Sequence, residues 1–500
     1  MKFNLKKYRV GLLVLTLAAP LGSCRKYLDE ENKGNFVKDN YFTTESQART
    51  FVNGIYTSLY MFQNGDAYGE SPFITLELFA GHATSLGQSV NNRAVILNTT
   101  SSVNPGFQTV WANSYNAISN ANIAIANIPN IAMPDATKKA LLGEAYFLRA
   151  FFYFHLVRLY GDVPLITEPV AINSENLYPT RTPYADVYAQ IVSDLQAAKV
   201  SGLPDTDQTG KVSLGAVRTL LGSVYLTMAG FPMNKPENYA LAAQEVQPVL
   251  TQYTLFDNYD YLHDNAHKNM GELIFQINYL VGVRENAIPQ LTLPFNLQVG
   301  AYGDHLGAMI PTNEFFASYE AGDKRTEERQ FYFSSYPKDK EPATIIQFGE
   351  HALYKYFHVE SALGNGKSDE NFTLLRLPEA MLIYAEASNE AESGPNATAY
   401  AQINAIRARA KLAPLSGLSQ SAFREAVWRE RYHELAYEDK AYFDIQRTHK
   451  IYKVSDSTFG DATSTANEQG VTMKQQYYLW PIPQREMNTN TKLTQNPGWQ

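Results

Sequence analysis

The chain has 500 residues, of which 45% are hydrophobic and 18% are charged, and its formal net charge is -8 at pH 7. This length is enough to bury one large core or two domains. An acidic chain without a long run of Lys and Arg is a poor candidate for binding nucleic acid, so no nucleic-acid partner is expected.

The first residues have the pattern of an export signal. Positively charged side chains at the start are followed by an almost unbroken apolar stretch over 10–19, which is too short to span a bilayer. Two small residues then precede Cys24, and this motif resembles the lipobox of bacterial lipoproteins, in which the cysteine carries the lipid. We therefore expect a signal peptide over 1–23, lipid attachment at Cys24 and a polar tether over 24–44.

Cys24 is also the only cysteine in the chain, so no internal disulfide can form and the fold must rest on its core. No apolar run of about 18 or more residues follows it. The lipid, rather than a spanning helix, is therefore expected to hold the protein on a membrane.

Helical periodicity dominates from 45 to 251 and returns from 375 to 500. Apolar residues recur at spacings of three and four over 141–159, 184–195 and 214–228, and Ser213 suits the cap of the last of these helices. Paired helices separated by short turns predict stacked tetratricopeptide-like units.

The stretch from 252 to 374 has a different character. Turn residues multiply, helical stripes disappear and aromatic residues stay dense. We expect long loops with short strands such as Leu273–Ile277. A loop-rich stretch of this length in a compact protein is usually functional.

Several stretches together resemble the SusD/RagB family of surface glycan- and nutrient-binding lipoproteins, and they occur in the family's order over nearly the whole mature chain. They are Gly143–Ala150, Arg158–Leu165, Arg376–Glu379 with Tyr384–Ala387, Ile403–Ala410, Glu430–Glu438, Phe443–Arg447, Pro481–Pro483 and Gln495–Trp499. The resemblance implies a mostly α fold, a right-handed superhelix of tetratricopeptide-like helix pairs. It also implies a loop-rich ligand-binding region, expected over 252–374, between helical regions over 45–251 and 375–500.

For function, the resemblance implies capture of an oligosaccharide or another polymer-derived nutrient and its delivery to a SusC-like TonB-dependent transporter. The protein would be lipid-anchored in the outer membrane, facing the cell exterior, and would need no cofactor and perform no catalysis. Peptide capture within the same family, a surface glycosidase and a structural adhesion lipoprotein are the alternatives. Many relatives carry an acidic residue where this chain has Phe79–His82, so their ligand preference is not carried over.

Aromatic content is the positive signal for a sugar ligand. The chain has 33 tyrosines, many of them in the expected loops. A flat ring offers an apolar face to sugar C–H groups, while neighbouring amides and guanidinium groups satisfy the hydroxyls. The candidate ligand residues lie in two loops: Gln88, Asn91, Asn92 and Arg93 in the first, and Tyr279, Arg284, Tyr302 and Asp304 in the second. The sequence leaves open whether a cation is bound.

Glu430 and Glu434 are the strongest candidates for catalytic groups, because their spacing puts both on one face of a helix. Two carboxylates could act as acid and base in glycoside hydrolysis. However, Arg429, Arg431 and Arg447 lie near them in sequence, and a buried carboxylate needs such partners simply to be tolerated. We therefore interpret this pair as scaffold and expect no catalytic residue.

Overall fold

The computed structural model describes residues 42–62, 70–87, 89–171, 174, 177–294, 297, 306–337, 344–361, 364, 368–467 and 469–499. Helices dominate the first and last parts of the chain. In chain order the longer ones are α3 (Glu45–Tyr56), α6 (Pro105–Asn127), α7 (Asp135–Tyr160), α8 (Tyr184–Lys199), α9 (Leu214–Ala229), α10 (Asn238–Val246), α14 (Leu377–Ala391), α15 (Ala397–Arg409), α16 (Gln420–Glu434) and α17 (Ala441–Thr448).

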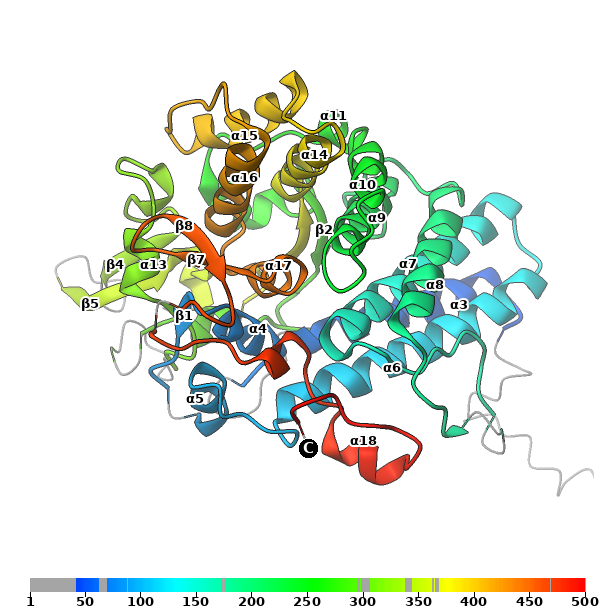
Figure 1. Cartoon of the computed structure of the whole chain (residues 1–500). Coiled ribbons are helices and arrows are strands. Elements are labelled where there is room, and N and C mark those ends of the chain that lie inside the picture. The colour runs from blue at the N-terminus through cyan, green and yellow to red at the C-terminus, as the bar shows by residue number, and fades with distance from the viewer. Residues whose placement is uncertain are drawn as a thin grey trace, which may run out of the picture.

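Consecutive long helices lie side by side. α6 packs on α7 and α7 on α8, then α9 packs on α10, α10 on α14, and α14 on both α15 and α16. Figure 1 shows these helices passing from the right-hand side of the molecule to its top. The predicted fold of stacked helix pairs is therefore confirmed.

The strongly periodic segments form the helices that their patterns predict. α7, α8 and α9 cover the three apolar stripes, and Ser213 caps α9 by accepting a hydrogen bond from the Ala216 N–H at 3.1 Å. Pro378 lies in the first turn of α14. α7 is long and apolar enough to cross a membrane, but 83% of its most apolar window is buried inside the protein. It is the central helix of the core.

Two helices near the first predicted loop have no clear stripe in the sequence. α4 (Pro72–Ala80) is buried on every side, so apolar residues fill it without a helical period. α5 (Val90–Ile96) is too short to show one, and Ser89 caps it. Burial on all faces and short length remove the periodic signal from which helices are predicted.

The strands form four antiparallel two-stranded sheets in the part of the chain that the structure describes. The pairs are β1 (Ala83–Thr84) with β3 (Ile310–Pro311), β2 (Leu273–Ile277) with β6 (Phe372–Arg376), β4 (Tyr332–Pro337) with β5 (Ile345–Leu353), and β7 (Lys450–Lys453) with β8 (Thr458–Asp461). The predicted strand Leu273–Ile277 is confirmed. Short helical elements lie between the longer helices and the strands: η3 (Thr57–Phe62), α11 (Val249–Gln252), η6 (Tyr259–Leu262), η7 (Asn265–His267), α12 (Ile288–Leu291), α13 (Asn313–Ala317), η8 (Lys324–Thr326) and η10 (Tyr354–Tyr356).

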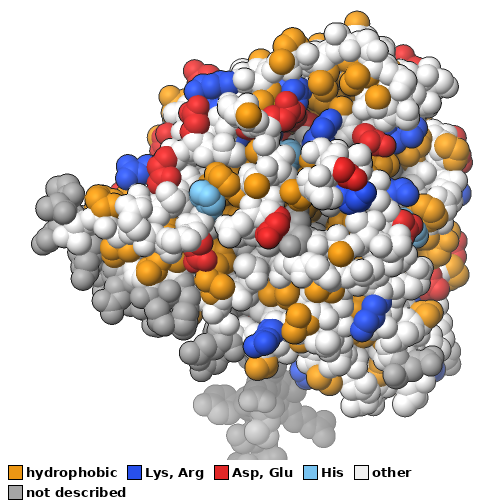
Figure 2. All heavy atoms as spheres, turned by 60° about the vertical axis from the view of Figure 1, so that its left-hand side comes forward, with side chains coloured by type: hydrophobic (Ala, Val, Ile, Leu, Met, Phe, Trp, Pro, Cys, Tyr) orange, Lys and Arg blue, Asp and Glu red, His pale blue; other side chains and the backbone are white. Residues whose placement is uncertain are grey.

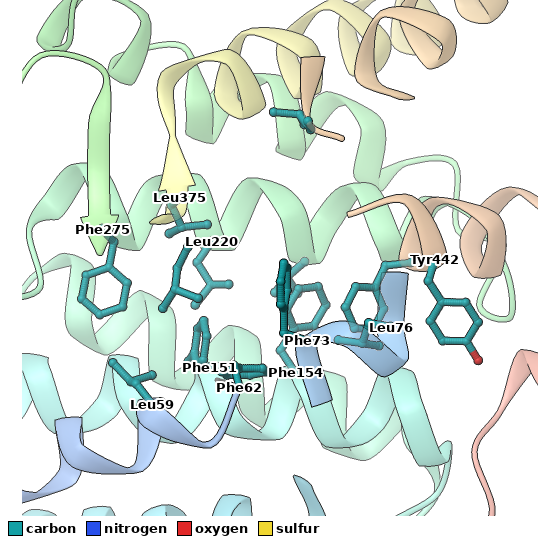
Figure 3. Packing of buried hydrophobic residues seen from close by; sticks show 14 of the residues in the cluster. Leu59, Phe62, Phe73, Leu76, Phe151, Phe154, Leu220, Phe275, Leu375 and Tyr442 are labelled. Atoms are coloured by element: carbon teal, nitrogen blue, oxygen red, sulfur yellow. The ribbon is translucent and has the colours of Figure 1, made fainter. Parts of the chain in front are cut away.

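One hydrophobic core joins all parts of the chain. Side chains from η3, α4, α7, α9, β2, β6 and α17 meet in it, as Figure 3 shows for Phe62, Phe73, Phe151, Leu220 and Phe275 among others. The helical parts and the loop-rich part therefore share this large core, and the loop-rich part also has a second, smaller cluster of Leu293, Phe333, Phe348, Ala352 and Phe357.

The last residues of the chain also pack on this core. After η12 (Gln475–Tyr478) the chain is extended, and Trp480 is fully buried. The Trp480 N–H donates to the Leu159 carbonyl at 2.6 Å, at the end of α7. The short helix α18 (Gln484–Thr489) follows. The C-terminal segment is therefore partly extended and packs on the body of the protein.

Candidate ligand-binding site

The two predicted loops begin and end beside each other. The backbone N–H groups of Leu86 and Gly87 both donate to the Gly307 carbonyl, at 2.8 and 3.2 Å, next to the β1–β3 pair. Gln88 follows Gly87 directly, and Tyr302 and Asp304 precede Gly307 by a few residues. Gln88, Tyr302 and Asp304 themselves lie outside the described residues, as does Cys24.

The first loop carries a small polar cluster at the start of α5. The Glu70 carboxylate accepts one hydrogen bond from the Ser89 hydroxyl at 2.6 Å and another from the Asn91 side-chain amide at 2.7 Å. Ser89 in turn accepts from the Asn92 N–H at 3.0 Å. These bonds fix the orientation of the half-buried Asn91 amide, which has further hydrogen-bonding capacity.

Asn92 and Arg93 differ sharply in exposure. Asn92 is only 1% exposed, because the helical turn that directs Asn91 outward directs Asn92 into the protein. Arg93 is exposed. Asn92 therefore helps to build the helix and is not available as a surface contact.

The second loop brings an aromatic and arginine cluster to the surface. The Tyr60 and Tyr279 rings lie 5.2 Å apart between centroids, and the Arg284 guanidinium carbon lies 4.8 Å from the centre of the Tyr60 ring. The Tyr60 hydroxyl donates to the Asn278 carbonyl at 2.8 Å. Tyr279 is 5% exposed, whereas Tyr60 is half-buried and Arg284 is exposed. Tyr279 therefore supports the cluster from below, and Tyr60 and Arg284 form its surface.

Burial and charge act in opposite directions on Tyr60. Partial burial raises the pKa of its phenol by disfavouring the phenolate, and the Arg284 guanidinium offsets part of that rise. The phenol therefore stays neutral at physiological pH, with its ring beside a cation. This arrangement is a cation–π contact.

Backbone hydrogen bonds hold the second loop against the segment before β6. The Asn286 N–H donates to the Ser368 carbonyl at 2.9 Å, and its side-chain amide donates to the Glu370 carbonyl at 2.9 Å. Asn371 accepts from the Tyr279 N–H at 3.0 Å. The cluster therefore rests on short strands and buried amides, and a loop held in this way keeps its contact groups in place.

The first and second loops lie at the same end of the β2–β6 pair. The ring of Phe73, at the start of α4, lies 5.1 Å from the ring of Phe372. Phe372 is paired with Ile277, two residues before Tyr279. Glu70 and Tyr60 come from the chain on either side of 63–69. Tyr60 is one of the tyrosines that indicate a sugar ligand in the sequence, but neither residue is among the predicted ligand residues, and the fold places both of them in the site.

The face carrying β4, β5 and α13 is drawn in Figure 2. Lys, Arg, Asp and Glu side chains of both signs are interspersed on it, between larger areas of uncharged polar and hydrophobic side chains. A surface without a field of one sign suits an uncharged ligand better than a polyanion or polycation.

Glu430 and Glu434 lie in a buried ion-pair cluster beneath this region. Glu434 is fully buried; one of its oxygens accepts from Arg376 at 2.6 Å and from Arg409 at 2.5 Å, and the other accepts from Arg325 at 3.1 Å. Glu430 accepts from Arg325 at 2.7 Å. The scaffold interpretation fits these contacts, because neither carboxylate faces solvent.

The arginine partners are different from those that the sequence suggested. Arg431 and Arg447 both pair with Asp444 instead, at 3.0 and 2.8 Å. The partners of Glu434 come from distant segments that the fold brings together. Burial by itself would raise the pKa of Glu434, but Arg409, Arg376 and Arg325 outweigh it and hold the pKa at about 2.

The segment Phe79–His82, where this chain departs from many relatives, does not supply a ligand group. His82 is fully buried among the rings of Phe315, Tyr432 and Tyr437, and its Nε2 lies 2.7 Å from Glu77 Oε2. The departure therefore changes the core below the first loop. Among the residues that the structure describes, no group of three or more His, Cys, Asp or Glu side chains is placed to hold a metal ion.

The chain matches known proteins along almost its whole length. Residues 258–499 match the SusD family, and residues 26–226 match a second family described as starch-binding associating with outer membrane. SusD-like protein P2 of Formosa agariphila is 30% identical, over 99% of this chain and 100% of its own length. The chain belongs to the SusD family. Identity at this level over both complete chains rules out a match that is limited to one shared segment.

Solved structures of SusD-like proteins have the same fold. A SusD superfamily protein from Parabacteroides distasonis is 34% identical and superimposes with a TM-score of 0.88, covering 91% of this chain and 99% of the other. A laminarin binding SusD-like protein is 24% identical with a TM-score of 0.74, covering 91% of this chain and all of the other. This chain and both of these proteins therefore share the mostly helical SusD fold.

Proposed function

We propose that this SusD-family protein captures an oligosaccharide at the cell surface and hands it to a SusC-like TonB-dependent transporter. The observation that carries the proposal is the surface that the two loops form, with the Tyr60 ring, the Arg284 guanidinium and the Asn91 amide at one end of the β2–β6 pair. The name of the laminarin binding neighbour is in keeping with a glycan ligand.

These groups have the chemistry that sugar recognition needs. An aromatic face packs against the C–H groups of a sugar ring, and planar amide and guanidinium groups hydrogen-bond to its hydroxyls. In our proposal Tyr60 supplies the face, Arg284 and Asn91 supply the polar contacts, and Arg93 lies close enough in sequence to Asn91 to extend them. Tyr302, Asp304 and Gln88 remain predictions for the same site.

The mechanism that we propose is binding without covalent chemistry. The strongest catalytic candidates, Glu430 and Glu434, are paired with buried arginines, which lower the pKa of Glu434, whereas burial raises the pKa of Glu430. Because neither carboxylate reaches solvent, neither is placed to exchange a proton with a bound glycan. Delivery to a transporter and a ligand-binding region over 252–374 are parts of this proposal that membership of the SusD family supports.

We further propose that a lipid on Cys24 anchors the protein in the outer membrane, facing the exterior. Two acyl chains or more provide stable attachment. Cys24→Ala should move the protein from the membrane fraction to the soluble fraction, with its melting temperature unchanged. Fractionation followed by immunoblotting measures this. Membrane association of the variant at the wild-type level would contradict the lipid assignment.

The second test concerns the ligand surface. The ligand for this test is a glycan that the wild-type protein retains in affinity electrophoresis. Asn91→Ala combined with Arg284→Ala should weaken binding of this glycan at least tenfold, equivalent to about 1.4 kcal/mol, because each substitution removes a polar contact to the ligand. The wild-type mature chain is first screened by affinity electrophoresis against a panel of neutral polysaccharides. Calorimetry with the retained glycan then measures the change.

The matched control replaces the same two residue types on the outer face of α3, as Arg49→Ala with Asn53→Ala, and should bind normally. The free energy of unfolding of both double variants should be within about 1 kcal/mol of the wild-type value, since surface substitutions rarely cost more. Normal binding by the loop variant would place the ligand elsewhere. Release of shortened glycan products would instead favour a glycosidase.

A further inference from the structure

A cavity lies in the helical part of the molecule. It has a volume of about 410 Å³ and is enclosed by α7, α8, α9, α17 and the residues that follow Gln475. Cavities that bind small organic molecules have volumes of roughly 300–1,000 Å³. None of the residues that line it belongs to the candidate ligand-binding site.

Arg158 brings a positive charge without a direct ion-pair partner to the wall of this cavity. Its guanidinium carbon lies 3.8 Å from the centre of the Phe154 ring and 3.5 Å from that of Phe443. Its Nε donates to the Phe154 carbonyl at 3.1 Å. Among the described residues no carboxylate pairs with Arg158, and both of its Nη groups are left without an acceptor.

Other charged groups at the wall are already satisfied. Arg447 is paired with Glu386 at 2.5 Å and with Asp444 at 2.8 Å. Arg181 donates to three backbone carbonyls and to the Asn496 side chain. The Asp162 carboxylate accepts from the Tyr184 N–H at 2.8 Å, and its charge interacts with that of Arg181. The Nη groups of Arg158 are therefore the donors at this wall that are available to hydrogen-bond to a ligand.

The pKa of Arg158 shows the same lack of a partner. Burial lowers it to about 10, and Tyr188 and Glu379 offset this only in part. For Arg447 burial acts in the same direction, but Glu386 and Asp444 outweigh it and the pKa is raised. A bound anion beside Arg158 would supply the compensation that Glu386 supplies to Arg447.

Another part of the wall is a stack of three flat rings. The Phe231 and His449 rings lie 3.8 Å apart at 5°, and the His449 and Tyr478 rings lie 4.1 Å apart at 16°. Burial lowers the pKa of His449, so its ring is neutral at physiological pH. The Gln446 side-chain amide donates to both the Arg158 and Tyr478 carbonyls, at 3.1 and 2.7 Å, and so ties the two walls together.

We propose that this cavity binds a small organic carboxylate with a flat apolar body. The Arg158 guanidinium holds the carboxylate through two parallel hydrogen bonds, a geometry that its planar fork favours. The apolar body lies along the Phe231, His449 and Tyr478 rings. This site is separate from the glycan surface, so the failure of one proposal leaves the other standing.

The test uses phenylacetate as the probe and the full mature chain as the protein. Calorimetry or saturation-transfer NMR should detect phenylacetate binding, with phenylacetamide, the uncharged analogue, binding at least tenfold more weakly. Arg158→Gln should reduce phenylacetate affinity at least tenfold. Phe231→Ala, at a ring that is 40% exposed, should weaken it severalfold without unfolding the protein.

Arg49→Gln, on the exposed face of α3, is the matched control and should bind phenylacetate normally. Melting curves accompany each variant, and if Arg158→Gln does not fold, Phe231→Ala decides the outcome. No binding by the wild type, equal binding of phenylacetamide, or wild-type affinity in Phe231→Ala would each overturn the proposal. In that case Arg158 serves only to pack between two rings.

Discussion

Replacing Glu434 by glutamine should lower the free energy of unfolding by about 3–5 kcal/mol, because it leaves buried guanidinium groups without their counter-ion. Glu434 accepts hydrogen bonds from Arg376, Arg409 and Arg325 and is fully buried. The amide that replaces it is neutral and turns a donor toward one of these donors. Denaturant unfolding followed by circular dichroism measures the change.

The same carboxylate makes stability depend on pH. Its pKa is lowered from 4.5 to about 2 in the folded protein, so its contribution is fully present above about pH 4.5 and is lost as the pH falls toward 2. Glu434→Gln should therefore lose less stability than the wild type over this window. Glu327→Gln is the control, because its ion pair with Lys411 is exposed and should be worth less than about 1 kcal/mol.

A Glu434→Gln variant that is stable but has lost a hydrolytic activity would contradict the structural role of Glu434. If Glu434→Gln were as stable as the wild type and abolished a measurable glycan hydrolysis, the carboxylate would be catalytic and not structural. The proposed absence of catalysis would then be wrong as well. The stability measurement and an activity assay on the same preparation distinguish these outcomes.

Replacing Trp480 by alanine should cost about 3–5 kcal/mol, because it opens a large cavity where the end of the chain meets the core. Trp480 is fully buried, and its ring lies 4.7 Å from Phe107 and 6.0 Å from both Phe79 and Tyr160, between centroids. The residues after Tyr478 should also become sensitive to protease. Melting curves and limited proteolysis with mass spectrometry measure both effects.

Trp428→Ala provides the comparison for Trp480→Ala. Trp428 is half-buried in α16 and contacts Phe459, so the same truncation removes less buried surface. We expect its cost to be about half as large or less. Equal costs for the two variants, with no new proteolytic cleavage near the C-terminus, would contradict the role of Trp480 as the anchor of the final segment.

Local pattern in the sequence determined those elements that carry an apolar stripe at helical spacing or a short β-prone run. α7, α8 and α9 carry apolar stripes at helical spacing, and Leu273–Ile277 is a short β-prone run between turn residues. Such patterns depend only on neighbours a few positions away, and the chain itself displays them. The motifs that carry the family resemblance are spread along the chain, and they too are present in the sequence itself.

Tertiary structure decided the contacts between distant segments. The sequence placed Glu430 and Glu434 on the buried face of one helix, but it suggested nearby arginines as partners. The actual partners of Glu434 are Arg325, Arg376 and Arg409, which come from the short helix η8, strand β6 and helix α15. Which of several arginines pairs with a carboxylate depends on how these elements pack, and the local spacing of residues in the sequence does not determine it.

In the ligand surface, too, the sequence determines the residue types and the fold determines which of them are exposed. Residue type selected Asn91, Asn92, Tyr279 and Arg284 equally, because amides, aromatic rings and guanidinium groups suit a sugar wherever they lie. Only the fold distinguishes them: Asn92 and Tyr279 are 1% and 5% exposed, while Arg284 lies at the surface over the Tyr60 ring. The chemistry of a site is present in the sequence, but exposure is a property of packing, and packing determines which of its groups a ligand can reach.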